Sequence, residues 1–167
     1  MIPAFVADAS VAIGWVHPAQ ETADTGLMLR DIEAGAVIEV PALWLLEVAN
    51  ALAVLVRRRK MTAAERDAAL RWLRAVPVRV DHEGAMLAFS RLSELSSAHG
   101  LSIYDASYLE LAQRKGLPLA CKDDPLLKAA LRLGVKIWRP GDEHAVQEER
   151  ARYIAPRASR LRVTARV

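Results

Sequence analysis

Short apolar runs alternate with longer amphipathic segments along most of the chain. The first run, at 4–7, predicts a short buried strand, and the helix that follows it begins at Asp8 or Ser10. A second helix is expected within 20–34, and the run VIEVP that ends at Pro41 predicts the next strand. The chain therefore opens as strand, helix, helix, strand.

The middle of the chain continues the alternation with longer helices. Strong helix formers fill 42–60, and the segment TAAE at 62–65 has the pattern of a capping box that opens a helix running to Pro77. The run VRV at 78–80 predicts a strand, and an amphipathic helix is expected over 83–98.

Four further elements are expected before the pattern ends. They are a helix at 103–115, a strand at 117–121, a helix at 125–133 and a strand at 135–138. Strands separated by helices predict a parallel sheet that is covered on both faces. We therefore expect an α/β fold with a central, mainly parallel sheet.

The periodic pattern weakens after Pro140, where the chain becomes charged and rich in arginine. We expect one folded domain at 1–139 and a C-terminal extension at 140–167, whose composition is typical of a mobile tail.

Composition and charge then narrow the class of protein. Hydrophobic residues make up 53% of the chain and charged residues 26%, which is typical of a globular protein. The single cysteine cannot form an internal disulfide, and the four histidines show no zinc-ligand spacing. Neither a secretory signal nor an apolar run of membrane-spanning length is present, so we expect a cytoplasmic protein without a membrane anchor. The net charge of +3 is compatible with a polyanionic partner.

Two acidic residues follow predicted strands. Asp8 comes directly after the first strand and Asp123 follows the strand at 117–121. Ligands of open parallel sheets bind beyond the carboxyl ends of the strands, so these positions suit a binding site. A helix-capping role for Asp8 explains its position equally well. Asp124 precedes Pro125 and is therefore the expected helix cap, which leaves Asp123 without a structural role.

Two more acids lie on predicted helices. Glu47 is the only ionisable side chain between Pro41 and Arg57, and its helical neighbours offer no cation. A charge on an apolar helix is costly, so its partner must be tertiary or a metal ion. Asp105 has a structural alternative, because Ser102 and Asp105 have the spacing of a capping box.

Convergence of these four acids would require a cation. Two carboxylates 4 Å apart repel each other by about 4 kcal/mol at an effective dielectric constant of about 20. An all-oxygen site favours hard divalent ions, Mg²⁺ or Mn²⁺. Such a site suits hydrolysis of a phosphodiester, because the metal activates water and shields the phosphate from the carboxylates.

Four ordered motifs resemble the PIN domain, and more narrowly the VapC-type toxins of bacterial and archaeal toxin–antitoxin pairs. The motifs are VADAS at the first strand, LLEVAN at 45–50, YDASYLELA at 104–112 and LACKDDPLLKAA at 119–130, and the resemblance covers 2–138. It implies a three-layer α/β/α sandwich, a homodimer and an antitoxin partner. It also implies an endoribonuclease that depends on Mg²⁺ or Mn²⁺ and leaves 5′-phosphate and 3′-hydroxyl ends.

The resemblance assigns roles to individual residues. The positions that match the family's acidic residues are Asp8, Glu47, Asp105 and Asp123. Ser10 and Asn50 match its accessory polar positions. Cys121 is a departure, because the family often has threonine there and a thiol is a weaker hydrogen-bonding group than a hydroxyl.

The substrate and the partner surfaces are less well defined by the sequence. Candidate RNA contacts are Arg57, Arg58, Arg59, Lys60 and Lys122, although runs of charge are usually solvated. Apolar helical faces at 42–56 and 63–76 suit the core, a dimer interface or antitoxin binding. The four tryptophans are expected in the core or in interfaces rather than under RNA bases.

Other functions remain open on sequence grounds. The chain also suits a solitary PIN-domain nuclease of RNA processing, or a non-catalytic PIN scaffold that binds a partner. An aspartyl phosphotransferase fits less well, because Ser10 stands where haloacid-dehalogenase-like phosphatases typically have a second aspartate. The sequence leaves the RNA target and the number of metal ions open.

Overall fold

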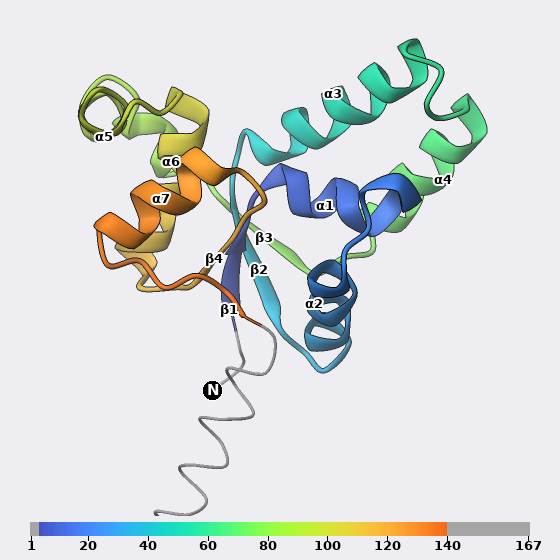
Figure 1. The fold of residues 1–167 in the computed structure, drawn as a ribbon, viewed down its shortest axis with the longest axis horizontal. Helices are drawn as coiled ribbons and strands as arrows, with labels where there is room; N and C mark the ends of the chain where they lie inside the picture. The colour runs from blue at the N-terminus through green and yellow to red at the C-terminus, as the bar shows by residue number, and fades with distance from the viewer. Residues whose placement is uncertain (1–3, 140–167) are drawn as a thin grey trace, which may run out of the picture.

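A four-stranded parallel sheet forms the centre of the molecule in the computed structural model, which describes residues 4–139 (Figure 1). Its strands, in the spatial order β3-β2-β1-β4, are β1 (Ala4–Ala7), β2 (Val37–Pro41), β3 (Val78–Asp81) and β4 (Leu119–Ala120). In the register, Phe5 pairs with Ile38 and Ile38 with Val78. The expected extension at 140–167 lies outside the described residues.

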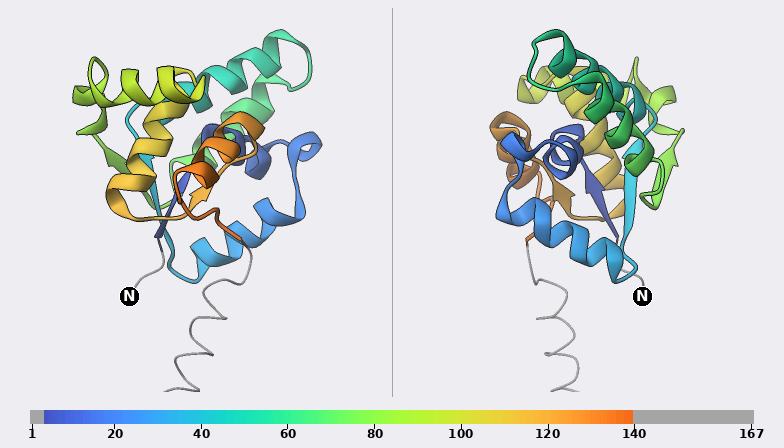
Figure 2. Two further views of the ribbon diagram at one scale, coloured as in Figure 1. Left: turned by 60° about the vertical axis from the view of Figure 1, so that its left-hand side comes forward. Right: turned by 90° about the vertical axis from the view of Figure 1, so that its right-hand side faces the viewer.

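Helices cover both faces of the sheet and complete three layers (Figures 1 and 2). One layer contains α1 (Ala9–Val16), α2 (Ala23–Glu33), α3 (Trp44–Arg57) and α4 (Ala63–Leu73). The other contains α5 (Arg91–His99), α6 (Ile103–Lys115) and α7 (Asp124–Arg132). The predicted α/β/α sandwich with a parallel sheet is therefore confirmed.

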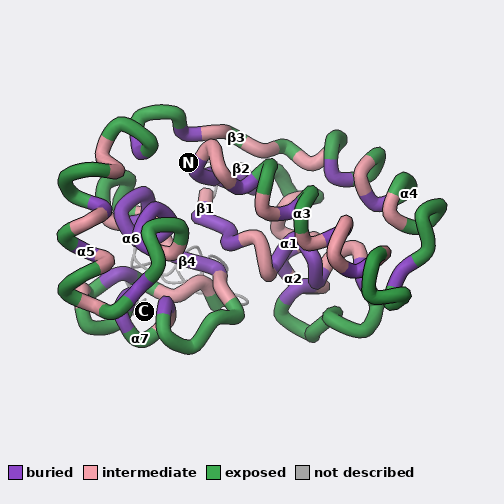
Figure 3. The backbone as a smooth tube through the Cα atoms, turned by 90° about the horizontal axis from the view of Figure 1, so that it is seen from above, coloured by how far each residue is buried: buried purple, intermediate pink, exposed green. Residues whose placement is uncertain are grey.

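The core lies between the sheet and the inner faces of these helices (Figure 3). Strands β1, β2 and β4 are almost wholly buried, whereas the edge strand β3 exposes Arg79 and is only partly buried at Val78 and Val80. Trp44 is buried, while Trp138 packs against Phe5 with ring centroids 5.9 Å apart, as expected for core residues. Trp72 is 42% exposed and meets Trp15 edge-on. No helix within residues 4–139 is both long and apolar enough to span a membrane.

Several predicted boundaries are confirmed because local chemistry determines them. The strands at 4–7 and 37–41 and the helix at 103–115 have the expected bounds. In the capping box of α4, Thr62 Oγ1 accepts from the Glu65 N–H at 3.2 Å, and a carboxylate oxygen of Glu65 accepts from the Thr62 N–H at 2.7 Å.

The single helix expected over 83–98 is wrong. The segment forms the short 3₁₀ helix η2 (Gly84–Leu87), then turns, and α5 begins only at Arg91. The carboxylate of Asp81 accepts from the Gly84 N–H at 2.9 Å and from Arg114 at 2.7 Å, so the segment is fixed to α6 at its start. This tertiary contact outweighs the helical periodicity of the sequence.

The strand expected at 135–138 is reduced to an isolated bridge between Leu119 and Ile137. Leu119 N donates to Lys136 O at 2.8 Å and Leu119 O accepts from Trp138 N at 2.9 Å. The strand expected at 117–121 is also shorter, since Pro118 has no N–H to donate to a ladder.

Candidate active site

A crevice lies between α1 and α7 at the carboxyl ends of β1 and β4. These two strands are neighbours, but the helices that follow them lie on opposite faces of the sheet (Figure 1). Ligand sites of doubly wound sheets form at such a switch point. A cavity of about 510 Å³ opens there, and all four predicted acids line it: Asp8, Glu47, Asp105 and Asp123.

Each of the four acids belongs to the start of a different helix. Asp8 caps α1 and Asp123 caps α7, while Glu47 lies in the first turn of α3 and Asp105 in the first turn of α6. Because the amino end of a helix carries partial positive charge, this arrangement stabilises carboxylates. Four helices thus direct their positive ends toward one cavity.

Asp8 is buried and held by Ser10. Its Oδ2 accepts from the backbone N–H of Ser10 at 3.1 Å and from the Ser10 hydroxyl. Burial raises the pKa of Asp8, the bonds from Ser10 oppose this rise, and the charge of Asp105 adds to it. The predicted capping role is therefore real, and it coexists with a place in the acidic cluster.

Glu47 has the tertiary partner that its sequence environment requires, but that partner is neutral. The hydroxyl of the fully buried Tyr108 donates to Glu47 Oε2. Burial raises the pKa of Glu47, the bond from Tyr108 opposes this, and the charges of Asp8 and Asp105 raise it further. Burial and Glu47 also raise the pKa of Tyr108, which keeps its donor proton.

Sequence reasoning missed Tyr108. The available signal was its position three residues after Asp105, which puts both side chains near one face of α6.

Asp105 combines a structural and an electrostatic role. Ser102 Oγ accepts from the Asp105 N–H at 3.0 Å and donates to Asp105 Oδ2 at 2.6 Å, so Ser102 is the expected cap. The Asp105 carboxylate interacts with both Asp8 and Glu47, whose pKa values it raises.

The expected cap of α7 is wrong. Asp123, not Asp124, is the N-cap, and its Oδ1 accepts from the Leu126 N–H at 3.0 Å. The proline takes the second helical position, so the cap lies one residue earlier than predicted. Asp123 therefore has a structural role, and it lines the cavity as well.

The loop before α7 joins both sides of the crevice. The Cys121 thiol lies 3.7 Å from Asp8 Oδ2, and its sulfur accepts from the Asp123 N–H at 3.1 Å. Burial, with the charges of Asp8 and Asp123, raises the pKa of the thiol, so it stays protonated. Lys122 N donates to Ser10 Oγ at 3.3 Å and Lys122 Nζ to Gln20 O at 2.7 Å.

Some of the remaining predicted residues line the cavity and others lie outside its lining. Ser10, Asn50, Arg58 and Lys60 line it with the acids, whereas Arg57 and Arg59 do not belong to its lining. The structure thus brings an acidic centre and two cations into one cavity.

The donor set suits a hard divalent cation. Within residues 4–139, no group of three or more Asp, Glu, His or Cys side chains is already arranged as metal ligands. The chemistry nevertheless fits, because Asp8, Glu47 and Asp105 repel one another and two of them have raised pKa values. A cation among these oxygens would remove that repulsion.

Comparisons with known proteins agree with this architecture. The family model of the PIN domain matches residues 5–133. The ribonuclease VapC3 of Mycobacterium tuberculosis is 34% identical over 124 residues, which cover 74% of this chain and 85% of VapC3.

Two solved structures share the fold at low sequence identity. VapBC2 from Rickettsia felis, bound to a DNA fragment from their promoter, aligns with a TM-score of 0.57 and 11% identity over 81% of this chain and 97% of that chain. VapC20 of Mycobacterium tuberculosis, a sarcin–ricin loop cleaving toxin, aligns with a TM-score of 0.51 and 23% identity. The alignment covers 75% of this chain and 94% of that chain.

Proposed function

Because the chain belongs to the PIN domain family and is homologous to the ribonuclease VapC3, we propose that it is a metal-dependent endoribonuclease and the toxin of a toxin–antitoxin pair. The observation that carries this proposal is the meeting of Asp8, Glu47, Asp105 and Asp123 in one cavity at the switch point of the sheet.

The positions of the four carboxylates suggest a different role for each pair. Asp8 and Asp123, which follow adjacent strands, would bind the cation directly, and Glu47 and Asp105 would complete the site or orient the attacking water. When bound, Mg²⁺ or Mn²⁺ lowers the pKa of water and shields the scissile phosphate from the carboxylates. Hydrolysis would leave 5′-phosphate and 3′-hydroxyl ends.

Accessory groups hold the acids in place. Ser10 and Cys121 both contact Asp8 Oδ2, and Asn50 lines the cavity one turn after Glu47. Cys121 occupies the position where a hydroxyl is common, so its weaker bond holds Asp8 less firmly.

We also propose a protein partner, an antitoxin that covers the cavity, and assembly as a homodimer, with RNA and antitoxin both met in the cytoplasm. The resemblance of the four sequence motifs to those of VapC-type toxins supports this proposal. Exposed apolar side chains on α3 support it too, since Leu45 and Leu46 are 54% and 75% exposed close to Glu47. Large apolar side chains that are exposed next to a cavity suit a protein interface.

An RNA-cleavage assay with Asp8→Asn tests the enzymatic proposal. The purified chain should cut an end-labelled RNA when Mg²⁺ or Mn²⁺ is present and should lose activity with EDTA. Asn can still cap α1 but lacks the charge, so we expect at least about 100-fold slower cleavage. Asp24→Asn, an exposed site in the first turn of α2, is the matched control and should cleave normally.

Other results would favour the competing functions. Cleavage that persists in Asp8→Asn, or without divalent ions, would contradict the four-carboxylate site. A phosphate covalently attached to Asp8 would indicate phosphotransfer, and metal-dependent binding of a partner without any cleavage would indicate a scaffold.

A further inference from the structure

One face of α3 lines the cavity along almost the whole helix. The lining positions recur at helical spacing and are Glu47, Asn50, Ala51, Val54, Leu55 and Arg58. The polarity of this face changes along the helix, from a carboxylate through an amide and an apolar stretch to a guanidinium. The cavity therefore has an acidic end and a basic end.

The two ends are well separated. Glu47 and Arg58 are eleven residues apart, which corresponds to a rise of about 16 Å along an α-helix. Figure 1 shows α3 starting above the centre of the sheet and running outward over α1 to its far tip. Ile13 and Gln20 line the cavity opposite α3.

The turn after α3 brings a second cation to the basic end. Lys60 N donates to Leu55 O and Arg59 N donates to Val56 O, both at 2.9 Å, which is the bonding pattern of a Schellman motif. Arg59 adopts a φ of 56°, a left-handed conformation that costs a side chain about 1 kcal/mol. The chain reverses there, so Lys60 returns to the cavity beside Arg58.

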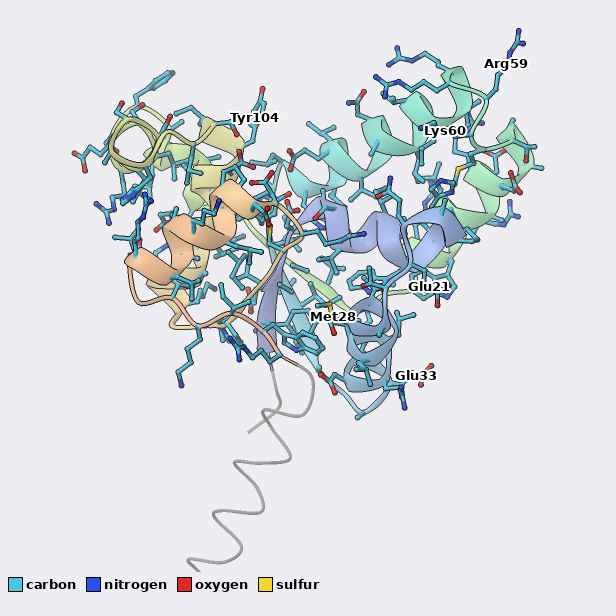
Figure 4. The ribbon with its side chains drawn as sticks, in the orientation of Figure 1. Glu21, Met28, Glu33, Arg59, Lys60 and Tyr104 are labelled. Atoms are coloured by element: carbon cyan, nitrogen blue, oxygen red, sulfur yellow. The ribbon has the colours of Figure 1, made fainter. Side chains whose placement is uncertain are left out.

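Helix electrostatics alone do not explain these two cations. Positive residues are favourable at any helix C-terminus, and that accounts for Arg57 and Arg59. Arg58 and Lys60 differ because they line the same cavity as the acids. Figure 4 shows Arg59 pointing outward from the tip of α3, while Lys60 lies on its inner side. No carboxylate within residues 4–139 forms an ion pair with either cavity cation.

We propose that Arg58 and Lys60 form a second phosphate site, which binds the backbone of single-stranded RNA several nucleotides from the scissile phosphate at the carboxylates. This inference rests on the proposed function. A polyanion with regularly spaced phosphates can occupy both ends of the cavity at once, whereas an acidic peptide suits only the basic end.

The length of RNA between the two sites follows from the geometry. A strand stacked as in a duplex advances about 3.4 Å per nucleotide, so about 16 Å corresponds to about five nucleotides, and to fewer if the strand is extended. None of the cavity-lining residues within 4–139 is aromatic, so phosphate contacts rather than base stacking must provide the affinity. Cleavage should therefore improve once an RNA is long enough to reach Arg58 and Lys60.

The test is a series of RNA oligonucleotides of about two to eight nucleotides, extended on the 5′ or the 3′ side of one cleavage site. For the unmodified chain, kcat/KM should rise sharply at a threshold length in one of the two series. Arg58→Gln and Lys60→Gln should each lower kcat/KM about 10-fold for RNAs beyond the threshold, with a progressively smaller loss below it. Each substitution should also reduce the slope of log K for RNA binding against log salt concentration by the amount that corresponds to about one phosphate contact.

Matched variants distinguish a second phosphate site from nonspecific electrostatic attraction between RNA and the basic protein surface. Arg57→Gln removes the same charge one residue away but outside the cavity lining, so any loss should be equal at all lengths. Arg71→Gln, an exposed position on α4, should have no effect. A loss for Arg58→Gln that is equal at every length, or no loss, would overturn the inference.

Binding measurements keep this inference separate from the proposed function. Fluorescence anisotropy with labelled RNAs and the Asp8→Asn chain reports binding without cleavage. If no RNA is cut but long RNAs still bind through Arg58 and Lys60, the proposed function fails and the phosphate site stands. If an acidic peptide binds there and RNA of any length does not, the phosphate site is contradicted.

Discussion

At the scale of single residues, Glu47 is held by a neutral partner, because the Tyr108 hydroxyl donates to its Oε2. A lysine or arginine beside Glu47 would have satisfied its charge and occupied the space of a metal ion. The Tyr108 hydroxyl instead orients the carboxylate and adds no charge. The bond leaves the Glu47 carboxylate without a counter-charge, while burial and the charges of Asp8 and Asp105 raise its pKa.

Tyr108→Phe tests this role. The substitution keeps the buried ring and removes only the hydroxyl, so we expect the free energy of unfolding to change by no more than about 1 kcal/mol. Loss of the orienting bond should weaken Mn²⁺ binding and lower kcat/KM about 10-fold, as for other groups that orient metal ligands. Titration with Mn²⁺ and RNA cleavage would measure the two effects.

The control for this variant is Tyr104→Phe, since Tyr104 is 61% exposed on the same helix. Equal behaviour of the two phenylalanine variants would show that the buried hydroxyl has no part in the site.

At the scale of elements, an ion-paired cluster determines how the chain enters the layer of α5, α6 and α7. Arg114 on α6 binds Asp81 at the end of β3, Glu110 one turn earlier on α6, and Glu83. The same Asp81 carboxylate accepts from Gly84 at the start of η2. This cluster sets the course of the segment that leads to α6, the helix that carries Asp105 and Tyr108.

Stability should therefore depend on pH through Asp81. Burial of Asp81 is outweighed by its bonds to Arg114 and Gly84, so its pKa in the folded state is lowered. A group with a lowered folded pKa contributes stability above its unfolded pKa of about 3.9, and that contribution disappears as the pH falls through the folded value. Asp81→Asn should cost about 2 kcal/mol at pH 7 and progressively less at lower pH.

Urea unfolding of both chains from neutral pH down to about pH 3 would measure this difference. Asp67→Asn, which breaks an exposed pair with Arg66, should change stability by less than about 1 kcal/mol at any pH. A constant difference between Asp81→Asn and the unmodified chain would contradict the role of the Asp81 charge.

At the scale of the whole molecule, the parts that could be predicted are those determined by local pattern. Buried strands at 4–7 and 37–41 and the capped helix at 103–115 follow from apolar runs, capping residues and glycines. The parts that could not be predicted depend on distant partners. Arg114 fixes the break before α5, and the backbone of Leu119 limits residues 135–138 to a bridge.

The candidate site divides in the same way. Asp8 and Asp123 could be located because the ends of parallel strands meet, and Glu47 because no neighbour satisfies its charge. Tyr108 could not be identified, since its role depends on α3 and α6 lying together. The sequence also could not show which residues of the basic run at 57–60 line the cavity. That depends on the left-handed turn at Arg59, which places Arg58 and Lys60 in the lining and leaves Arg57 and Arg59 outside it.

The whole molecule therefore places mutually repelling carboxylates at the switch point of a parallel sheet and a pair of cations at the far end of the same cavity. Burial and repulsion make the acidic end unfavourable without a counter-charge. That end is the feature on which the proposed cleavage depends.

The most direct test is the anomalous scattering of a crystal soaked in Mn²⁺. We expect a peak in the cavity, about 2.0–2.2 Å from carboxylate oxygens of Asp8 and Asp123, with Glu47 and Asp105 around it. The peak should be absent from a crystal of the Asp8→Asn chain. A soaked crystal of the unmodified chain with no manganese among these four carboxylates would contradict the account.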